Sequence, residues 1–551
     1  MGIYFKKILK FGATALLFLM SLMAVACNNS SDTPFIPFIP SSKGGKVVES
    51  KLIQRDSFND IIAAQQKAGN TAAVQELKQK KQKYLENFKK SMKKKVAKKN
   101  VVLKSKASNT PNKILTNESE VDAFFNSFGI DELCPWVATY TLKYTTTSAS
   151  GEPITASTRA LVNYGEVWPF TWYAETDIVL LHCHATQMQN SAIPTSQSGS
   201  GATECGLLYF EAWNDVMVIS PDYEGYGATK DRVHPYLIQD VTAQQCYDAA
   251  RAAYNWKQGE DGDGNDLNGF EDDFYTVAAG YSQGGSVALA VQRYIQNNDS
   301  GNVLRLKGSL CGDGPYDPFA TYSKYADDNY QMYLPSVIIL ILRAYLYYYK
   351  DSYLKGFTVE DYLKPEIIQA LKDNAPDGKG NVWGMVDSKT KSTSDVDGVL
   401  KKAAGKEGES YISVSDVITA KAMDEKSDAY KALKAALDTN NLTDKSTWNG
   451  GKNDKITAAM HWQGDDAVPY KNRESLNNNL TVKDKGWSKD ATDVIQTLAN
   501  FLSLMGISDS LDDVKTLIED DPYVRSGNHV AAGKLFFLGN ISCRMDYKSL
   551  D

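Results

Sequence analysis

One serine of this chain has a glycine two residues before it and another two residues after it, a spacing that can produce a nucleophile. The stretch GYSQG, residues 280–284, follows a short apolar run at 277–279 and precedes an apolar pattern of helical period from Ser286. A strand that turns this sharply into a helix leaves no room for side chains two residues before or after the serine. We therefore predict that Ser282 is exposed as a nucleophile. The alternative is a glycine-rich strand-to-helix turn without chemistry.

A nucleophilic serine needs a general base, and the base needs a carboxylate that orients it. These residues follow an elbow serine in the order acid, then histidine. Asp465 stands just past the apolar run ITAAMHW and three residues before Val468, with Asp466 as the second choice. The chain has 5 histidines, and His529 follows the acid. We predict a triad of Ser282, Asp465 and His529, although a lone histidine before a helix is ordinarily structural.

The negative oxygen formed during acyl transfer needs backbone N–H donors. The residue after the nucleophile supplies the first donor, which is Gln283 here. The second comes from the loop after the apolar strand IVLLHC, residues 178–183. We predict Thr186 as this donor and Gln187 as the runner-up. Ala185 stands where glycine is usual in this loop, and alanine has less backbone freedom than glycine, so the backbone conformation at residue 185 is not fixed by this comparison.

The elements around these residues alternate between strands and helices. Residues 136–147 and 154–163 alternate apolar and polar side chains and predict opening antiparallel strands. The runs at 178–183, 216–220, 277–279 and 304–310 are largely apolar, as buried parallel strands are. Helical patterns separate several of these runs. This order predicts an α/β fold with a mostly parallel sheet.

The alternation stops at about residue 316 and resumes at about residue 455. The intervening segment is mostly helical and contains the apolar run at 337–349. Arg343 and the limited length of this run argue against a membrane span. We interpret residues 316–455 as a cap inserted into a catalytic domain that covers residues 111–551. We expect polar residues in place of Ile339 and Leu342 of the apolar run to weaken hydrolysis of longer acyl esters more than that of acetate.

The first 27 residues have the pattern of an export signal. Lys6, Lys7 and Lys10 precede an apolar core at residues 13–25, which is too short for a spanning helix. The end of this core is similar to a bacterial lipoprotein cleavage site, which implies lipidation of Cys27. Ala24 replaces the leucine usual three residues before the cysteine. The resemblance implies an exported lipoprotein of the outer membrane.

Residues 28–110 predict a tether followed by a lysine-rich helical segment. The tether, up to about Val47, is rich in Pro, Ser and Gly, and the helical pattern runs from about Val48 to Val102. Apolar residues such as Leu77 and Phe88 lie near one face of this pattern, among many lysines. The segment could lie on an anionic membrane or glycan, or it could pack on the enzyme through its apolar stripe.

Composition narrows the possible partners. The chain has 551 residues, 42% of them hydrophobic, and a net charge of −7, which argues against nucleic acid as a partner.

We expect most cysteines after Cys27 to be buried free thiols, with one or two disulfides possible, and their spacing is not that of a metal site. These residues are Cys134, Cys183, Cys205, Cys246, Cys311 and Cys543. No cofactor is expected.

One acidic stretch is spaced partly like a calcium loop. It begins at Asp261 and ends at Asp272. Asp266 stands at the sixth position, where such loops need glycine, and Asp272 stands at the twelfth, where they use glutamate. A polar surface turn is the alternative, and we favour it.

Several motifs together resemble a known family. VISPDYEGYG with the later HPYL, then GYSQGG, then DDAVP are similar to the secreted lipase and esterase family of α/β hydrolases. That family includes cell-wall-degrading esterases of plant-pathogenic bacteria and, more distantly, fungal secretory lipases. The resemblance covers residues 178–310 and the acid and histidine regions. It implies the α/β-hydrolase fold with a helical cap, and ester hydrolysis. It also implies that Tyr223, Tyr226 and Tyr281 contact substrate, although the turn 222–226 could instead be a buried turn that shapes the site.

These patterns predict an exported, lipid-anchored serine hydrolase that cleaves carboxylic esters through an acyl-enzyme. The expected partners are a small-molecule, glycan or lipid ester and the membrane that holds the anchor. A serine peptidase on the same fold is the alternative enzyme, because a triad alone does not distinguish esters from amides. A surface-binding lipoprotein without catalysis is the alternative of a different class.

Overall fold

The computed structural model describes residues 44–67, 71–128, 132–197, 204–208, 212, 216–262, 264, 266–299, 301–325, 330–461, 464–482, 529–530, 533 and 536. These residues all belong to one compact unit, Pro40–Asp551. Cys27, the predicted signal peptide and the tether up to residue 43 lie outside the described residues, as does Cys543. Within the described part, helices long and apolar enough to cross a membrane are absent.

Five neighbouring strands of an 11-stranded sheet run parallel, in the order β8, β7, β9, β10, β13. Their bounds are β7 (Thr176–Cys183), β8 (Val216–Pro221), β9 (Phe270–Tyr281), β10 (Leu306–Gly312) and β13 (Ile456–Met460). Strand β7 is buried along almost its whole length, as a central strand covered on both faces must be. The predicted α/β fold with a mostly parallel sheet is confirmed.

The remaining strands of this sheet pair in an antiparallel manner. They are β1 (Val47–Ser57), β2 (Val101–Ser105), β3 (Lys113–Leu115), β4 (Cys134–Thr147), β5 (Pro153–Val167) and β6 (Phe170–Tyr173). Strands β4 and β5 correspond to the predicted opening pair. Strand β1 differs from the sequence prediction, which had a helical pattern from about Val48. It is a strand because it pairs with β4, and such long-range pairing overrides local helical propensity.

The lysine-rich segment forms two helices that follow β1. These helices are α2 (Phe58–Lys67) and α3 (Thr71–Val96), and α4 (Glu118–Asn126) packs near them. The apolar face of α3, including Leu77 and Phe88, is buried in the same hydrophobic core as the sheet. On its basic side, Lys93 forms an ion pair with Asp122 of α4 at 2.7 Å. The contacts of α3 therefore favour the interpretation that this helix packs on the rest of the protein through its apolar stripe.

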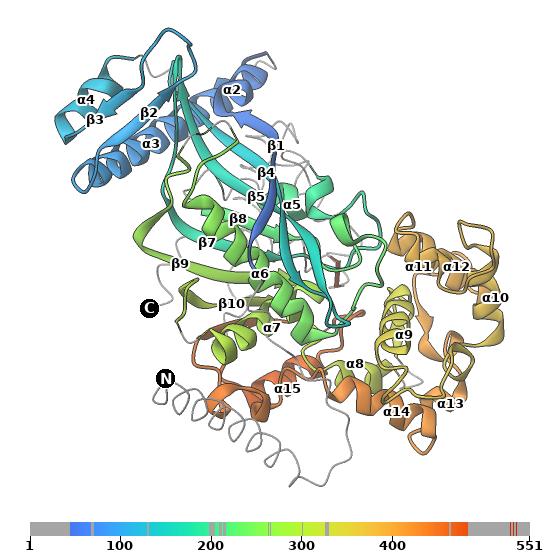
Figure 1. Cartoon of the computed structure of the whole chain (residues 1–551). Coiled ribbons are helices and arrows are strands. Elements are labelled where there is room, and N and C mark those ends of the chain that lie inside the picture. Colours follow the sequence, from blue (N-terminus) through green and yellow to red (C-terminus); the bar gives the residue numbers. More distant parts are fainter. Residues whose placement is uncertain are drawn as a thin grey trace, which may run out of the picture. The chain divides into compact units, whose positions relative to one another are not determined.

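Helices of the α/β unit cover the sheet. They are α5 (Glu204–Leu207), α6 (Gln239–Lys257), α7 (Gln283–Asn298) and α15 (Lys471–Asn479). Helices α6 and α7 pack against each other and lie on one face of the sheet (Figure 1). Helix α7 contacts β9 and β10, which places its first residue at the carboxyl end of β9.

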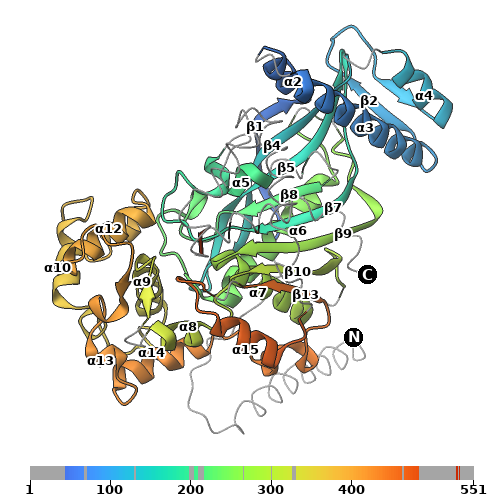
Figure 2. The same cartoon turned by 180° about the vertical axis from the view of Figure 1, so that it is seen from behind.

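The chain between β10 and β13 forms a helical cap with its own hydrophobic core, as predicted. Figures 1 and 2 show it in yellow and orange to one side of the sheet. Its elements are α8 (Pro318–Tyr325), β11 (Gln331–Met332), α9 (Ser336–Tyr348), α10 (Pro365–Asp373), α11 (Gly384–Asp387), α12 (Thr393–Ala403), β12 (Ile412–Ser413), α13 (Ala420–Met423) and α14 (Asp428–Asp438). Ile339 and Leu342 of α9 are buried within this cap core.

The stretch from Asp261 to Asp272 is engaged by protein donors. The Tyr173 hydroxyl donates to the Asp261 carboxylate at 2.9 Å. The Lys257 side-chain nitrogen donates to the backbone carbonyl of Leu267, which is the seventh position of the calcium-like spacing. Lys257 is fully buried, and burial lowers its pKa to about 7. A lysine thus contacts the carbonyl that a calcium ion would use, which favours the polar-turn interpretation.

The cysteines whose side chains the structure describes are all buried. Cys183, Cys205, Cys246 and Cys311 are buried free thiols, as expected. Burial raises the pKa of Cys205 and of Cys311 to about 12, so these thiols stay protonated at neutral pH.

Candidate active site

Ser282 lies between the end of β9 and the start of α7 with an unusual backbone conformation. Its φ is 57° and its ψ is −123°, in a region that residues other than glycine rarely adopt. Its backbone N–H donates to the carbonyl of Gly312 at 2.8 Å, which ties the turn to the end of β10. Such strain is characteristic of functional turns, and here it lifts the Ser282 side chain above the end of the sheet.

The two glycines around Ser282 are required by space. A Cβ atom on Gly280 would lie 2.3 Å from the carbonyl oxygen of Gly284. A Cβ atom on Gly284 would lie 1.9 Å from the carbonyl oxygen of Cys183, at the end of β7. Both distances are far below van der Waals contact, and both obstacles are backbone. The turn can therefore form only with glycine at positions 280 and 284.

The structure brings the three predicted triad side chains together. The His529 Nε2 atom lies 2.7 Å from the Ser282 hydroxyl oxygen, and the His529 Nδ1 atom lies 2.7 Å from an Asp465 carboxylate oxygen. The other Asp465 oxygen accepts hydrogen bonds from the backbone N–H groups of Ala467 and Val468, at 2.9 and 2.6 Å. The carboxylate is thus held by its own loop, with one oxygen directed at the imidazole. This geometry can move a proton from Ser282 to His529.

The surroundings of His529 favour its protonated form. Burial by itself lowers the pKa of an imidazole, but the Asp465 carboxylate and its hydrogen bond more than offset burial, so the pKa of His529 is raised above 6.5. A raised pKa makes the imidazole a stronger base toward the serine proton. It also means that His529 is neutral, and able to accept that proton, only at higher pH.

Asp466, the second choice for the acid, contacts the backbone of His529 instead of its ring. One Asp466 oxygen accepts the His529 backbone N–H at 3.0 Å. The other accepts the hydroxyl of Tyr411 at 2.9 Å, and Tyr411 belongs to the cap. Asp466 therefore holds the main chain of the base and links it to the cap.

A further buried carboxyl group, Asp313, lies close to the triad. The Tyr281 hydroxyl lies 2.6 Å from an Asp313 oxygen and 2.6 Å from the His529 backbone carbonyl. Burial raises the pKa of Asp313 to about 6, although His461 opposes the rise. Among the described residues, Asp313, Asp465 and His529 are close enough to share a metal ion. Both Asp465 oxygens already accept protein hydrogen bonds, one from its own loop and one from the His529 ring. These contacts are the ones that a carboxylate orienting a general base makes.

The two predicted oxyanion donors come from different segments, the start of α7 and the loop after β7. Gln283 is the first residue of α7, so its backbone N–H is one of the helix donors that have no intrahelical acceptor. Thr186 lines the cavity beside Ser282. The preceding amide, Ala185, donates to both carboxylate oxygens of Glu204 at 3.1 Å, and this contact fixes the loop. The Glu204 carboxylate also lies 2.6 Å from the His182 Nε2 atom.

Ser282 and His529 open into a mostly apolar cavity of about 270 Å³. The cap supplies Pro315, Thr321, Tyr325, Leu334, Val337 and Thr393, and the sheet side supplies Ala185, Thr186, Glu204, Tyr236, Leu237, Tyr281, Ala467, Val468, Val530 and Gly533. The apolar members, such as Leu334 and Val337, escaped the sequence prediction because they come from segments far apart in the chain. Ile339 and Leu342, where we expected polar replacements to weaken hydrolysis of longer acyl esters, do not line the cavity because they are buried in the cap core.

The tyrosines predicted to contact substrate lie in different places. Tyr281 lines the cavity, whereas Tyr223 and Tyr226 are buried below the loop that follows β7 and do not line it. The Tyr223 hydroxyl donates to the His184 carbonyl at 3.1 Å. For the turn at 222–226, the structure favours the second interpretation, a buried turn that supports the site without lining the cavity.

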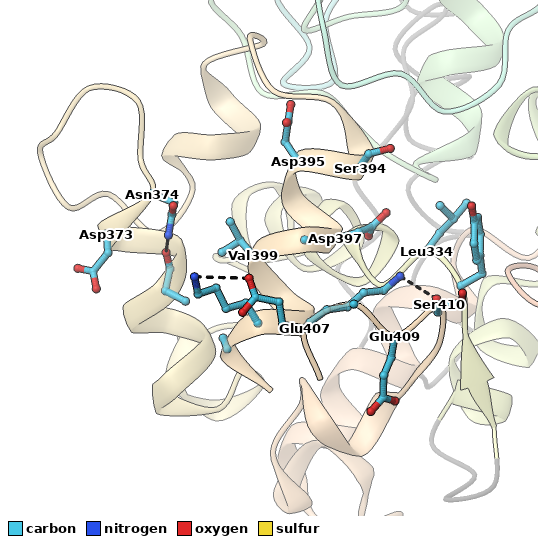
Figure 3. Close-up of a pocket in the computed structure, with 17 residues that line it drawn as sticks. Leu334, Asp373, Asn374, Ser394, Asp395, Asp397, Val399, Glu407, Glu409 and Ser410 are labelled. Atoms are coloured by element: carbon cyan, nitrogen blue, oxygen red, sulfur yellow. Dashed lines mark hydrogen bonds and ion pairs between the residues drawn. The ribbon is translucent and has the colours of Figure 1, made fainter. Parts of the chain in front are cut away.

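A larger and more polar cavity of about 880 Å³ lies in the cap (Figure 3). Residues of α10, α12 and the segment 407–410 line it. Lys401 donates to the Ser410 carbonyl at 2.7 Å, and Lys402 lies 3.6 Å from Glu407. Leu334 lines both this cavity and the one beside Ser282. No described triad residue lines the cap cavity.

Neither a scan against models of known protein families nor a search of curated proteins finds a match for this chain. Among solved structures, the chain is similar to the rice cell wall degrading esterase LipA from Xanthomonas oryzae, with a TM-score of 0.51 and 18% sequence identity. That alignment covers 86% of this chain and 98% of the esterase. The chain is also similar to Candida antarctica lipase A, with a TM-score of 0.42 and 12% identity over 67% of this chain and 78% of the lipase.

The likeness to the Xanthomonas structure concerns the fold, and the sheet described above agrees with it. The parallel strands carry a strained serine turn after β9, and a helical cap enters between β10 and β13. The chain has the α/β-hydrolase fold.

Proposed function

We propose that this protein is a serine hydrolase that cleaves carboxylic esters. The observation that carries the proposal is the chain of two 2.7 Å contacts from Asp465 through His529 to Ser282, at the wall of an apolar cavity. A solved structure to which this fold is similar is an esterase, and the assay below distinguishes ester cleavage from peptide cleavage.

The geometry supports the following sequence of steps. The Ser282 oxygen attacks the ester carbonyl carbon while His529 Nε2 accepts the serine proton. The backbone N–H groups of Gln283 and Thr186 stabilise the negative oxygen of the tetrahedral intermediate. This intermediate collapses, His529 returns the proton to the leaving alcohol, and an acyl-enzyme on Ser282 remains. Water then attacks the acyl carbon while His529 accepts a proton from it. The bond to the Ser282 oxygen breaks, His529 returns the proton to that oxygen, and the carboxylic acid leaves.

The size of the cavity favours esters with short acyl groups as substrates. Its volume of about 270 Å³ lies just below the range of pockets that hold drug-sized ligands. The apolar side chains of Leu237, Leu334 and Val337 favour an alkyl chain over a charged group. We propose that esters with acyl chains of a few carbons react faster than long-chain esters.

A series of p-nitrophenyl esters from acetate to palmitate, with a proline-type anilide beside it, tests this function. The expected result is hydrolysis that favours short acyl chains, no cleavage of the anilide, and loss of turnover in folded Ser282→Ala protein. Unchanged hydrolysis by Ser282→Ala would contradict the assignment, and preferential cleavage of the anilide would favour the peptidase.

We also propose that the protein is exported and anchored by a lipid on Cys27, at the outer membrane. The supporting observation is the sequence of the first 27 residues, with its basic start and apolar core. Cys27→Ala should move the protein from the membrane fraction to the soluble fraction. A wild-type protein that is fully soluble and unlipidated by mass spectrometry would overturn this proposal.

A further inference from the structure

The loop that carries the predicted oxyanion donor Thr186 rests on three buried tyrosines. The Tyr223 hydroxyl donates to the carbonyl of His184 at 3.1 Å, and the Tyr226 hydroxyl donates to the carbonyl of Gln187. The Tyr236 hydroxyl lies 2.9 Å from the side-chain oxygen of Thr186 itself. Hydrogen bonds with tyrosine hydroxyls thus hold this loop before, at and after the donor residue.

His234 connects these tyrosines to the other oxyanion donor. Its ring centre lies 6.1 Å from that of Tyr223, 5.0 Å from Tyr226 and 5.8 Å from Tyr236. We call these four residues the aromatic cluster. The His234 Nε2 atom accepts a hydrogen bond from the side-chain amide of Gln283 at 2.8 Å. Gln283, which supplies the first donor, is therefore linked to the same cluster that holds the loop with the second donor.

The tautomer of His234 follows from its two contacts. The Nδ1 atom lies 2.8 Å from the backbone carbonyl of Glu224, which can only accept, so Nδ1 carries the proton. The Nε2 atom is then free to accept from Gln283. Burial lowers the pKa of His234 to about 3, so the ring stays neutral, and Nε2 remains an acceptor, at every pH where the enzyme would work.

We propose that the aromatic cluster positions the two oxyanion donors relative to each other, with Tyr223, Tyr226 and His234 as positioning residues that do not touch the substrate. The inference rests on the proposed function, because an oxyanion forms only if Ser282 attacks a carbonyl. It also accounts for the motifs VISPDYEGYG and HPYL, which contribute all four members of the cluster.

A rigid support for these donors matters because oxyanion stabilisation depends on distance. Removal of one oxyanion donor in other serine hydrolases lowers kcat by about 10²- to 10³-fold. A displacement of about 1 Å caused by a distant mutation can cost about 10²-fold. The cluster residues are buried and hydrogen-bonded to the backbone, so loss of one contact should shift a donor without removing it. The expected effect is therefore smaller than that of a lost donor.

Tyr226→Phe tests the proposal with a matched control in the cap. Tyr226 is 1% exposed and donates to the backbone carbonyl of Gln187, whereas Tyr362 is 0% exposed and donates to the backbone carbonyl of Ala429 at 3.1 Å, inside the cap core. Both substitutions remove one buried hydroxyl that serves a carbonyl. We expect Tyr226→Phe to lower kcat by roughly 10-fold with KM nearly unchanged. Tyr362→Phe should lower Tm by about as much as Tyr226→Phe does, but it should leave kcat and KM unchanged.

An inhibitor that mimics the tetrahedral intermediate provides the second readout. A trifluoromethyl ketone with a short alkyl chain forms an oxyanion on the serine, so its affinity reports on the two N–H donors. Its Ki should rise in Tyr226→Phe by about the same factor by which kcat falls, and the midpoint of the pH profile should stay in place. Tyr223→Phe should give the same pattern, which guards against a single unstable variant.

His234→Phe and Gln283→Met break the contact between the cluster and the first donor from its two sides. Each should lower kcat, and the double variant should lose no more than the larger single loss, because both remove the same hydrogen bond. Full activity in Tyr226→Phe, Tyr223→Phe and His234→Phe would overturn the proposal, as would a rise in KM at constant kcat. Ester turnover that survives Ser282→Ala would instead refute the proposed function itself.

Discussion

The residues around Ser282 and the residues of the cap face the same cavity, but different interactions hold them. At the sheet edge, backbone and side-chain hydrogen bonds of 2.6 to 3.0 Å hold Asp465, His529 and Ser282. In the cap, Leu334 and Val337 reach the cavity from elements that are held mainly by apolar packing. Hydrogen bonds fix direction as well as distance, whereas apolar contacts fill volume.

This difference separates chemistry from selectivity. A change at the sheet edge misdirects a proton or a charge and should affect every ester alike. A change in the cap alters the space for the acyl chain and should affect esters according to their size. The predictions below test this separation, beginning with the largest expected effect.

His529→Ala should lower turnover by about 10³-fold or more for every ester tested, because Ser282 loses its proton acceptor. His461 is the matched control. It is also buried, but its Nε2 atom lies 2.9 Å from the carbonyl of Val468 and 3.8 Å from Asp465. Steady-state kinetics of both variants give the comparison. Loss of turnover in His461→Ala with full activity in His529→Ala would show that the base comes from another loop.

Asp465→Asn should lower kcat by about 10²- to 10⁴-fold, because an amide no longer fixes the correct imidazole tautomer. Asp466→Asn is the paired variant and should cost far less. Its side chain contacts the His529 backbone and Tyr411, and an amide oxygen can still accept one of these hydrogen bonds. Equal losses in the two variants would mean that main-chain position matters as much as the tautomer.

The pH dependence should reflect the raised pKa of His529. The imidazole must be neutral to accept the serine proton, so kcat/KM should rise with pH and reach half its maximum above pH 6.5. Below that midpoint, activity should fall about tenfold per pH unit. In Asp465→Asn the residual activity should have a lower midpoint, because the carboxylate that raises the pKa is gone. An unchanged midpoint in that variant would exclude Asp465 as the cause.

The cap should set chain-length preference by a smaller factor. Val337→Ala enlarges the cavity by two methyl groups and should improve octanoate relative to acetate by roughly 3- to 10-fold, at about 0.8 kcal/mol per buried methylene-sized group. Ile339→Val is the matched control on the same helix, because Ile339 is 0% exposed within the cap core and does not line the cavity. The ratio of the two rates measures the effect. An equal change of the octanoate-to-acetate ratio in both variants would mean that chain-length preference depends on the stability of the cap and not on the shape of the cavity.

The sequence predicted the chemistry better than the space around it. Gly280 and Gly284 mark the turn because a Cβ at either position would overlap with backbone, and the small number of histidines left His529 as the partner after Asp465. The apolar part of the cavity lining was not predicted, because Leu237, Leu334 and Val468 come together only through the fold. Strand β1 was missed for the same reason, since its pairing partner β4 lies about 90 residues further along the chain.

Labelling of the nucleophile tests the central claim most directly. A p-nitrophenyl alkylphosphonate reacts with an activated serine and leaves a stable adduct whose position mass spectrometry can identify. The account predicts one adduct per chain, on Ser282, formed at a rate that falls steeply in His529→Ala and hardly at all in His461→Ala. An adduct on another residue, or labelling of Ser282 that does not depend on His529, would contradict it.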